Sequence, residues 1–112
     1  MNLTSETVKQ VFVIHLQGEI DASSCLILDS ELETAIKNGE KRIIVRCAEL
    51  DYISSAGLGV FTSYAQELEN QNISLVLCEL KENVLDVFSL LGLDAIIPIV
   101  KTFDEAMNRV NE

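Results

Sequence analysis

The sequence predicts an α/β protein with a mainly parallel sheet of four to five strands and about four helices. Two observations lead to this prediction. Runs of β-branched residues alternate with segments of helical periodicity in the order β-β-α-β-α-β-α-β-α, which favours parallel strands joined by right-handed crossovers. The 112 residues contain no linker, internal repeat or low-complexity segment, and 48% of them are hydrophobic. We therefore expect one domain with a sizeable core over residues 1–112.

The first two strands are expected to pair as neighbours. Residues 8–17 form an apolar run that is continuous from Val11, and this predicts a strand buried on both faces. Residues 3–9 predict a weaker edge strand that pairs back with it through a turn near Lys9-Gln10. The segment Gly18–Asp21 is expected to end the second strand.

The first helix is expected over about residues 22–38. Its apolar positions recur on one face, and Asn38-Gly39 is typical of a helix C-terminus. A third strand follows over Lys41–Cys47, and a second helix ends near Asn70. Three residues at the start of the first helix are good helix caps: Asp21, Ser23 and Ser24.

The last third of the chain continues the alternation. Residues 73–79 and 96–100 predict strands, and residues 82–91 predict a short helix between them. The segment Thr102–Glu105 has the spacing of a capping box, with threonine followed by glutamate three residues later. It is expected to open a terminal helix through Val110.

Charge and composition exclude several classes of partner. The net charge of −10 opposes binding to nucleic acid or to an anionic membrane, since both need a basic surface. No segment approaches the ~20 apolar residues that span a bilayer, and Met1–Glu6 does not resemble a signal peptide. The three cysteines lie in separate apolar runs, so we interpret them as core residues of a cytoplasmic protein: Cys25, Cys47 and Cys78.

No enzyme signature is found, and we expect neither catalysis nor a metal or cofactor. The only histidine, His15, lies inside a strand run with no cysteine spaced to share a metal ion with it, and is expected to be a packed or half-exposed strand residue. The chain has no glycine-rich loop ending in lysine, and Gly57-Leu58-Gly59 lacks the third glycine of a dinucleotide-binding motif. The acidic residues are mostly scattered, which is typical of a solvated surface.

The junction Leu50–Val60 is the main candidate site. It leads from a strand into a helix and contains the pair Ser54-Ser55 followed by Gly57 and Gly59. One serine is expected to cap the helix, and the glycines are expected where the helix packs closely on the sheet. A helix N-terminus also favours an added phosphate, so phosphorylation is the alternative role. The loop Gly18–Ser24 follows another strand and adjoins the junction if the two strands are neighbours.

Residues 51–59, which read Asp-Tyr-Ile-Ser-Ser-Ala-Gly-Leu-Gly, resemble the signature of the STAS domain of bacterial anti-sigma-factor antagonists. The segment Gly18–Asp21 is similar to the first conserved loop of that family, and Phe88–Leu93 resembles a further family stretch. The order of strands and helices and the excess of acidic residues also resemble the family, so the resemblance covers nearly the whole chain. It identifies residues 1–112 as a single STAS domain.

This resemblance implies a switch between partners. An unphosphorylated antagonist of the family binds an anti-sigma factor that is a serine kinase of the histidine-kinase-like ATPase fold, and so frees a sigma factor. The kinase phosphorylates a serine at the start of the second helix, after which the antagonist dissociates, and a PP2C-type phosphatase restores it. By resemblance the phosphorylated residue is Ser55, and Asp21 matches an acidic residue that lies beside it.

Two departures from the family pattern leave alternatives open. Many members have aspartate where this chain has Ser54, and serine or threonine where it has Ala56, so Ser54 is a second candidate acceptor. A STAS signalling or scaffold module with a non-sigma partner is one alternative function, and a small phosphate- or nucleotide-binding protein is another. The residues expected to bind the partner are Asp21, Ser23, Ser54, Ser55, Ala56, Gly57 and Leu58.

Overall fold

Five strands and four α-helices follow one another in the order that the sequence predicts. The computed structural model describes residues 1–112. The strands are β1 (Asn2–Val8), β2 (Val11–Ile20), β3 (Arg42–Ile53), β4 (Ser74–Cys78) and β5 (Ile99–Val100). The helices are α1 (Cys25–Lys37), α2 (Ser55–Asn70), α3 (Glu82–Leu90) and α4 (Phe103–Val110), with a short 3-10 helix, η1 (Leu93–Ala95), after α3.

The sheet has the strand order β1-β2-β3-β4-β5, with β1 antiparallel to β2 and every other pair parallel. The predicted fold class, a mainly parallel α/β sheet, is confirmed. The hairpin between β1 and β2 turns at Lys9 and Gln10, whose φ angles of 50° and 69° are both positive. Two positive φ angles match the twist of a two-residue hairpin turn, so the predicted turn is confirmed as well.

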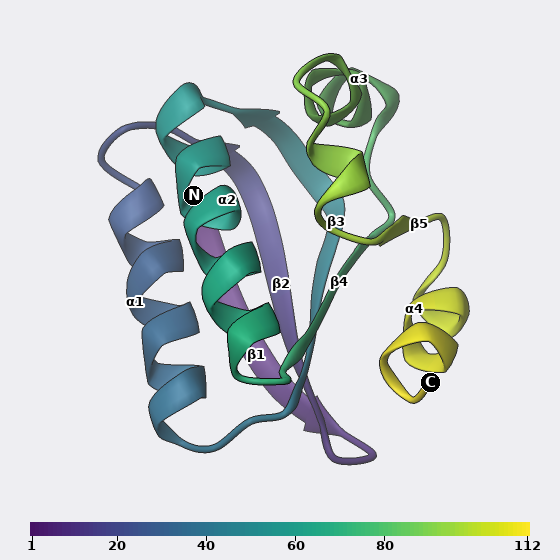
Figure 1. Ribbon diagram of the computed structural model, residues 1–112. Coiled ribbons are helices and arrows are strands. Elements are labelled where there is room, and N and C mark those ends of the chain that lie inside the picture. The colour runs from purple at the N-terminus through teal and green to yellow at the C-terminus, as the bar shows by residue number, and fades with distance from the viewer.

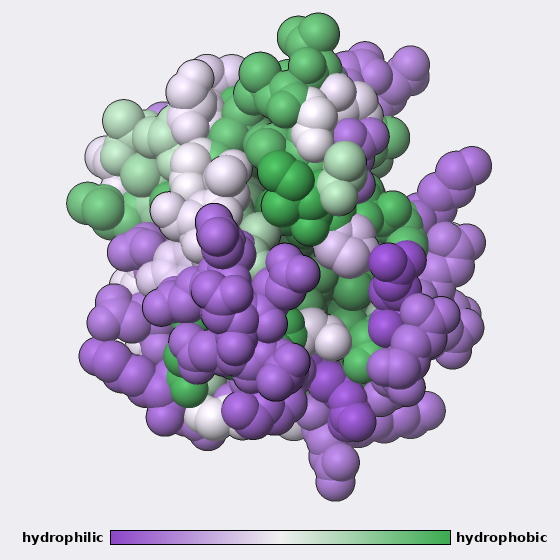
Figure 2. Space-filling view, viewed as in Figure 1, coloured by the Kyte–Doolittle hydropathy of each residue, from purple (hydrophilic) through white to green (hydrophobic).

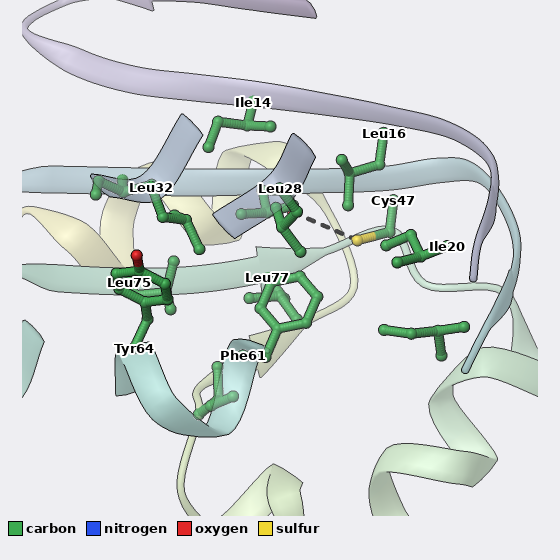
Figure 3. Packing of buried hydrophobic residues seen from close by; sticks show 14 of the residues in the cluster. Ile14, Leu16, Ile20, Leu28, Leu32, Cys47, Phe61, Tyr64, Leu75 and Leu77 are labelled. Carbon is green, nitrogen blue, oxygen red and sulfur yellow. Dashed lines mark hydrogen bonds between the residues drawn. The ribbon is translucent and has the colours of Figure 1, made fainter. Parts of the chain in front are cut away.

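The larger hydrophobic core lies between the sheet and the helices α1, α2 and α3. Helices α1 and α2 lie side by side on one face of the sheet, with α3 beside them (Figure 1). In this layer Leu28 and Leu32 from α1 pack with Phe61 from α2 (Figure 3). The three cysteines are buried and free, as expected, and Cys47 lies within this core (Figure 3).

Helix α4 covers part of the opposite face of the sheet. A second, smaller core forms there from one side of the central strands and from two residues of α4, Ala106 and Val110. The predicted capping box is present in part: Thr102 Oγ1 accepts a hydrogen bond of 3.1 Å from the Glu105 N–H, but the Glu105 carboxylate accepts from the Lys101 N–H (3.3 Å) rather than from that of Thr102. Helices thus lie on both faces of the parallel part of the sheet, as is usual for parallel sheets.

Strands β2 and β3 extend further than predicted. We expected β2 to end at Gln17 and β3 to end at Cys47, but they continue to Ile20 and Ile53, which pair with each other. Irregularities in the β2–β3 register and the polar residues of these segments hide the strand pattern in the sequence. The extension matters for function because it brings the two strand ends side by side.

Other boundaries also differ from the predictions. Helix α1 begins at Cys25, three residues later than expected, because Ala22–Ser24 form a turn. The last strand is limited to Ile99–Val100, because Ile96 and Ile97 still belong to the turn that follows η1 and Pro98 lies outside the strand. The prediction for His15 is confirmed, because this histidine is half-exposed on β2 and lies 2.9 Å from the Glu6 carboxylate.

Candidate functional site

The ends of β2 and β3 place the two candidate loops in contact. Ile20 is the register partner of Ile53, and the Ser54 N–H donates a hydrogen bond of 2.8 Å to the Ile20 carbonyl. The loop after β2 and the start of α2 therefore begin at adjoining points on the sheet. The prediction that these loops adjoin is confirmed. In Figure 1 the N-termini of α1 and α2 lie at the top of the view, where these strands end.

The serine pair divides into a cap and a free hydroxyl. Ser54 has extended backbone angles (φ −82°, ψ 170°), and its Oγ accepts from the Gly57 N–H at 3.3 Å. It is half-buried and is the N-cap of α2. Ser55 is the first residue of the helix and is exposed. The expected helix cap is therefore confirmed and belongs to Ser54, which leaves the Ser55 hydroxyl facing solvent.

The first turn of α2 is electrostatically suited to an anion. It contains no acidic residue, so no side chain of that turn offsets the positive end of the helix dipole. The backbone N–H groups of this turn point toward the N-terminus of the helix, where an anion can accept from them. The N-terminus of α2, taken by itself, would therefore stabilise a phosphate on Ser55.

The two glycines of the junction differ in burial and in the space around them. Gly57 is buried, and a Cβ atom on it would lie 2.8 Å from both Ile20 Cγ2 and Ile53 Cγ1. The absence of a side chain thus allows α2 to start directly against the two strand ends, as predicted. Gly59 is exposed, and a Cβ atom there would meet nothing within 4 Å. The prediction of close packing at Gly59 was wrong, because this residue lies on the outer side of the helix.

The Asp21 carboxylate organises the loop after β2. Its Oδ1 accepts from the N–H groups of Ser24 (2.8 Å) and Ser23 (3.0 Å), and it also lies within 3.0 Å of both serine hydroxyls. These hydrogen bonds, led by the one from the Ser24 N–H, lower the pKa of Asp21 to about 2. Asp21 is exposed. It therefore presents a fixed negative charge at neutral pH, and its Oδ2 accepts no hydrogen bond within the chain.

Five of the seven residues predicted to bind a partner reach the surface. Asp21, Ser23, Ser55 and Ala56 are exposed, and Ser54 is half-buried. The remaining two face the protein interior. Gly57 is buried, and Leu58 is 5% exposed and belongs to the main core. The expectation that the Leu58 side chain lies at the partner surface was wrong, since the fourth residue of α2 points toward the sheet.

Helix α3 contributes a contact that the sequence did not reveal. The Asn83 side chain donates a hydrogen bond of 2.9 Å to the Asp51 carbonyl, and the Lys81 ammonium forms an ion pair with the Asp51 carboxylate. These contacts hold the end of β3 three residues before Ser54. About thirty residues separate the partners in the sequence, and no local pattern links them.

The structure offers no metal site and no membrane-spanning helix. No three His, Cys, Asp or Glu side chains lie in an arrangement that could hold a metal ion. None of the helices has the length and apolar character needed to cross a bilayer. Burial raises the pKa of the Cys78 thiol to about 12, so this cysteine is protonated at neutral pH.

Comparisons with known proteins agree on one protein family. A model of the STAS domain family matches residues 2–106. The chain is 36% identical over 106 residues to BtrV of Bordetella bronchiseptica, named as an anti-sigma factor antagonist, which covers 95% of this chain and 91% of BtrV. It is 33% identical over 87 residues to the anti-sigma-B factor antagonist of Bacillus subtilis, over 77% of this chain and 78% of that protein.

Solved structures of the anti-sigma factor antagonist SpoIIAA from Bacillus share the fold. The unphosphorylated form has a TM-score of 0.76 and 26% identity, with 98% of each chain covered. The phosphorylated form has a TM-score of 0.74 and 27% identity, with 97% of this chain and 99% of SpoIIAA covered.

Proposed function

Because the chain belongs to the STAS domain family and is similar to its anti-sigma factor antagonists, we propose that, when unphosphorylated, it binds an anti-sigma factor that is a serine kinase and so frees a sigma factor. Phosphorylation of Ser55 by that kinase ends the complex, and a PP2C-type phosphatase restores the free serine. The protein acts in the cytoplasm as a single STAS domain, by binding alone, with neither catalysis nor a cofactor.

The observation that carries this proposal is the exposed hydroxyl of Ser55 at the first position of α2. Ser54 is a weaker candidate acceptor, because its hydroxyl already caps the helix and its side chain is half-buried. Modification of Ser54 would remove a cap that typically contributes about 1 kcal/mol to stability. Modification of Ser55 leaves every hydrogen bond of the junction in place.

A phosphate on Ser55 acts on the complex rather than on the fold. It adds about −1.5 to −2 charges at neutral pH, and the positive end of the α2 dipole favours this charge in the free protein. In the complex the same charge is desolvated or lies beside partner carboxylates, and either effect disfavours binding. A coupling free energy of roughly 1–3 kcal/mol between phosphorylation of Ser55 and binding of the kinase changes the affinity for the kinase about 5- to 150-fold. A change of this size is enough to exchange partners.

The Asp21 carboxylate gives the same surface a negative charge suited to a basic partner. Its charge persists to a pH near 2, and the free Oδ2 can accept from an arginine or lysine of the partner. A nucleotide-binding function has less support, because two hollows of the surface, of about 260 and 500 Å³, are lined by residues outside both candidate loops.

The test uses the purified anti-sigma serine kinase of the same bacterium and ATP, with mass spectrometry to locate the phosphate. We expect wild type and Ser54→Ala to be labelled on Ser55, and Ser55→Ala to remain unlabelled. Labelling on Ser54 or at another residue contradicts the assignment of the acceptor.

Binding of the unmodified variants to the kinase tests the switch. Ser55→Asp introduces a charge and is expected to raise the Kd at least about tenfold. Ser55→Asn has a similar size without the charge and serves as the matched control, with a Kd near that of wild type. Equal affinity of Ser55→Asp and Ser55→Asn would argue against an electrostatic switch. Capture of a partner without kinase activity would favour the scaffold function instead.

A further inference from the structure

The edge of β4 that faces β5 is incompletely paired. Strand β3 lies opposite every residue of β4, whereas β5 lies opposite only the last two. Successive residues of a parallel strand direct their backbone N–H and C=O groups to alternate neighbours. The Leu77 N–H donates to the Pro98 carbonyl on the side of β5. Leu75, two residues earlier in the strand, therefore directs its N–H and C=O to that same side.

The backbone groups of Leu75 have no hydrogen-bond partner within the chain. By continuation of the register Ile97 would lie opposite Leu75, but the Ile97 N–H donates instead to the Leu93 carbonyl at 2.9 Å. Pro98 has no N–H that could donate to the Leu75 carbonyl. Leu75 is only 7% exposed, and buried backbone groups are nearly always paired. The sheet edge therefore has a gap of one strand residue.

A hollow of about 260 Å³ lies at this gap. Its lining includes Leu75 and Val76, whose side chains belong to the cores on opposite faces of the sheet. The hollow is therefore at the edge of the sheet, where a further strand would lie, and not on either face. Between α2 and α4, Figure 2 shows hydrophobic residues with hydrophilic residues on either side.

The unpaired groups select an extended peptide as the occupant. Its carbonyl would accept from the Leu75 N–H, and its N–H would donate to the Leu75 carbonyl, which is the pairing used in strand addition. The hollow is smaller than the roughly 300–1,000 Å³ pockets that bind small molecules. A second copy of this chain is a poor occupant, because each copy carries a net charge of −10.

Charged residues at the rim of the hollow define the side chains of the occupant. Arg109 of α4 is exposed and has only a 3.6 Å contact with Glu112, and Glu69 of α2 is exposed without an ion pair. Side chains of an extended peptide alternate between the two faces of a sheet. The residue opposite Leu75 would face the apolar lining on the side of α2. Its neighbours would face Arg109, and the residues beyond them would return to the side of Glu69.

We propose that the edge of β4 at Leu75 is a strand-addition site for an extended segment of a partner protein. The segment has an apolar residue opposite Leu75, acidic residues on both sides of it, and basic residues one position further out. Leu68, which lines the hollow, lies about 20 Å from Ser55 along the axis of α2. The site is thus separate from the candidate phosphorylation site, and this chain can hold a second partner whatever the state of Ser55.

The test is an NMR titration of the isotope-labelled protein with the blocked peptide acetyl-Lys-Glu-Ile-Glu-Lys-amide, whose isoleucine favours an extended chain. We expect the largest change in amide shift at Leu75, with the proton moving downfield as its hydrogen bond forms. The control peptide carries N-methyl groups on the isoleucine and on the glutamate after it. It cannot donate to the Leu75 carbonyl in either strand direction, and we expect it to bind at least about tenfold more weakly.

A second comparison tests the arrangement of charges. The peptide acetyl-Glu-Lys-Ile-Lys-Glu-amide has the same composition with the charges exchanged, and we expect it to bind at least about threefold more weakly than the first peptide. Arg109→Glu should remove this preference, after circular dichroism has confirmed that the variant is folded. Ser55→Asp should bind the first peptide as well as wild type does, because the two sites are far apart.

Four results would overturn the inference. No shift at Leu75, shifts centred on Ser55 instead, or equal binding of the N-methylated peptide would exclude strand addition at this edge. A preference for the first peptide that persists in Arg109→Glu would contradict the assigned charge pattern. If the Leu75 amide shifts with protein concentration before any peptide is added, a second copy occupies the edge in place of a partner. None of these results affects the proposed function, which depends on the labelling of Ser55.

Discussion

Replacing Gly57 with alanine adds a methyl group where the start of α2 meets the ends of β2 and β3. The added carbon would lie 2.8 Å from Ile20 Cγ2 and from Ile53 Cγ1, well inside ordinary van der Waals contact. Both isoleucines are buried, and these atoms lie close to their own backbones, so neither side chain can swing away. Helix α2 must shift outward or the isoleucines must leave their rotamers.

The size of the effect follows from a comparison with Gly59→Ala. Both substitutions replace glycine in the same helix, and neither glycine has a positive φ, so each gains up to about 1 kcal/mol in helix propensity. At Gly59 the methyl group enters open space, and we expect that gain as a net stabilisation. At Gly57 overpacking costs about 1–3 kcal/mol. The two variants should therefore differ by about 1–3 kcal/mol, with Gly57→Ala the less stable.

Urea unfolding followed by circular dichroism measures this difference. A difference of 1 kcal/mol corresponds to about 4 °C in Tm for a chain of this size, so thermal unfolding provides a second readout. Kinase labelling of Ser55 in Gly57→Ala should also be slower, because the shifted helix start moves the acceptor relative to Asp21. Equal stabilities of the two alanine variants would refute the close approach that we infer at Gly57.

Three further predictions test other contacts of the site and the sheet. Ser54→Ala should lower the free energy of unfolding by about 0.5–2 kcal/mol through loss of the cap, whereas Ser54→Gly should cost only about a few tenths; equal costs in urea unfolding would argue against a capping role. The pKa of Asp21 is lowered from 3.8 to about 2, so its contribution to stability is fully present above about pH 4 and is lost as the pH falls through 2. The stability of Asp21→Asn should therefore depend less on pH than that of wild type between these two pH values, as measured by acid unfolding. An acid transition identical to that of wild type would contradict the hydrogen bonds assigned to the Asp21 carboxylate. Arg46 donates two hydrogen bonds of 2.7 Å to the Glu79 carboxylate, and Arg46→Met should cost about 1–3 kcal/mol because it leaves that half-buried carboxylate unpaired. Arg109→Met, which breaks an exposed pair at 3.6 Å, should change stability by less than about 0.5 kcal/mol, and similar effects of the two arginine variants would show that burial of the pair is irrelevant.

The order of strands and helices could be predicted because each of them has a local pattern in the sequence. Apolar periodicity marks which residues face a core, and the capping box and the Lys9-Gln10 turn depend on neighbouring residues alone. The ends of β2 and β3 could not be predicted in this way. Their last residues pair only because the neighbouring strand supplies hydrogen-bond partners and a shifted register, and this is a tertiary effect.

The candidate site was predicted in its chemistry and only partly in its geometry. A serine pair between a strand and a helix indicates a cap and an anion-accepting N-terminus wherever it occurs. Which side each residue of α2 faces depends on how the helix lies on the sheet. For this reason the burial of Leu58 and the open surroundings of Gly59 were mispredicted, and the contacts from Asn83 and Lys81 to Asp51 were missed.

The sequence by itself determined the fold class, the acidic character and the two loops of the candidate site, because these depend on composition, periodicity and local hydrogen-bonding preferences. The tertiary structure alone decided that Ser54 is the cap and Ser55 the free hydroxyl, since the hydrogen bond from Ser54 to the Ile20 carbonyl orients the start of α2. It also decided which apolar residues remain outside the core. The physical reason is that exposure is a property of packed surfaces, which form only when segments distant in sequence meet.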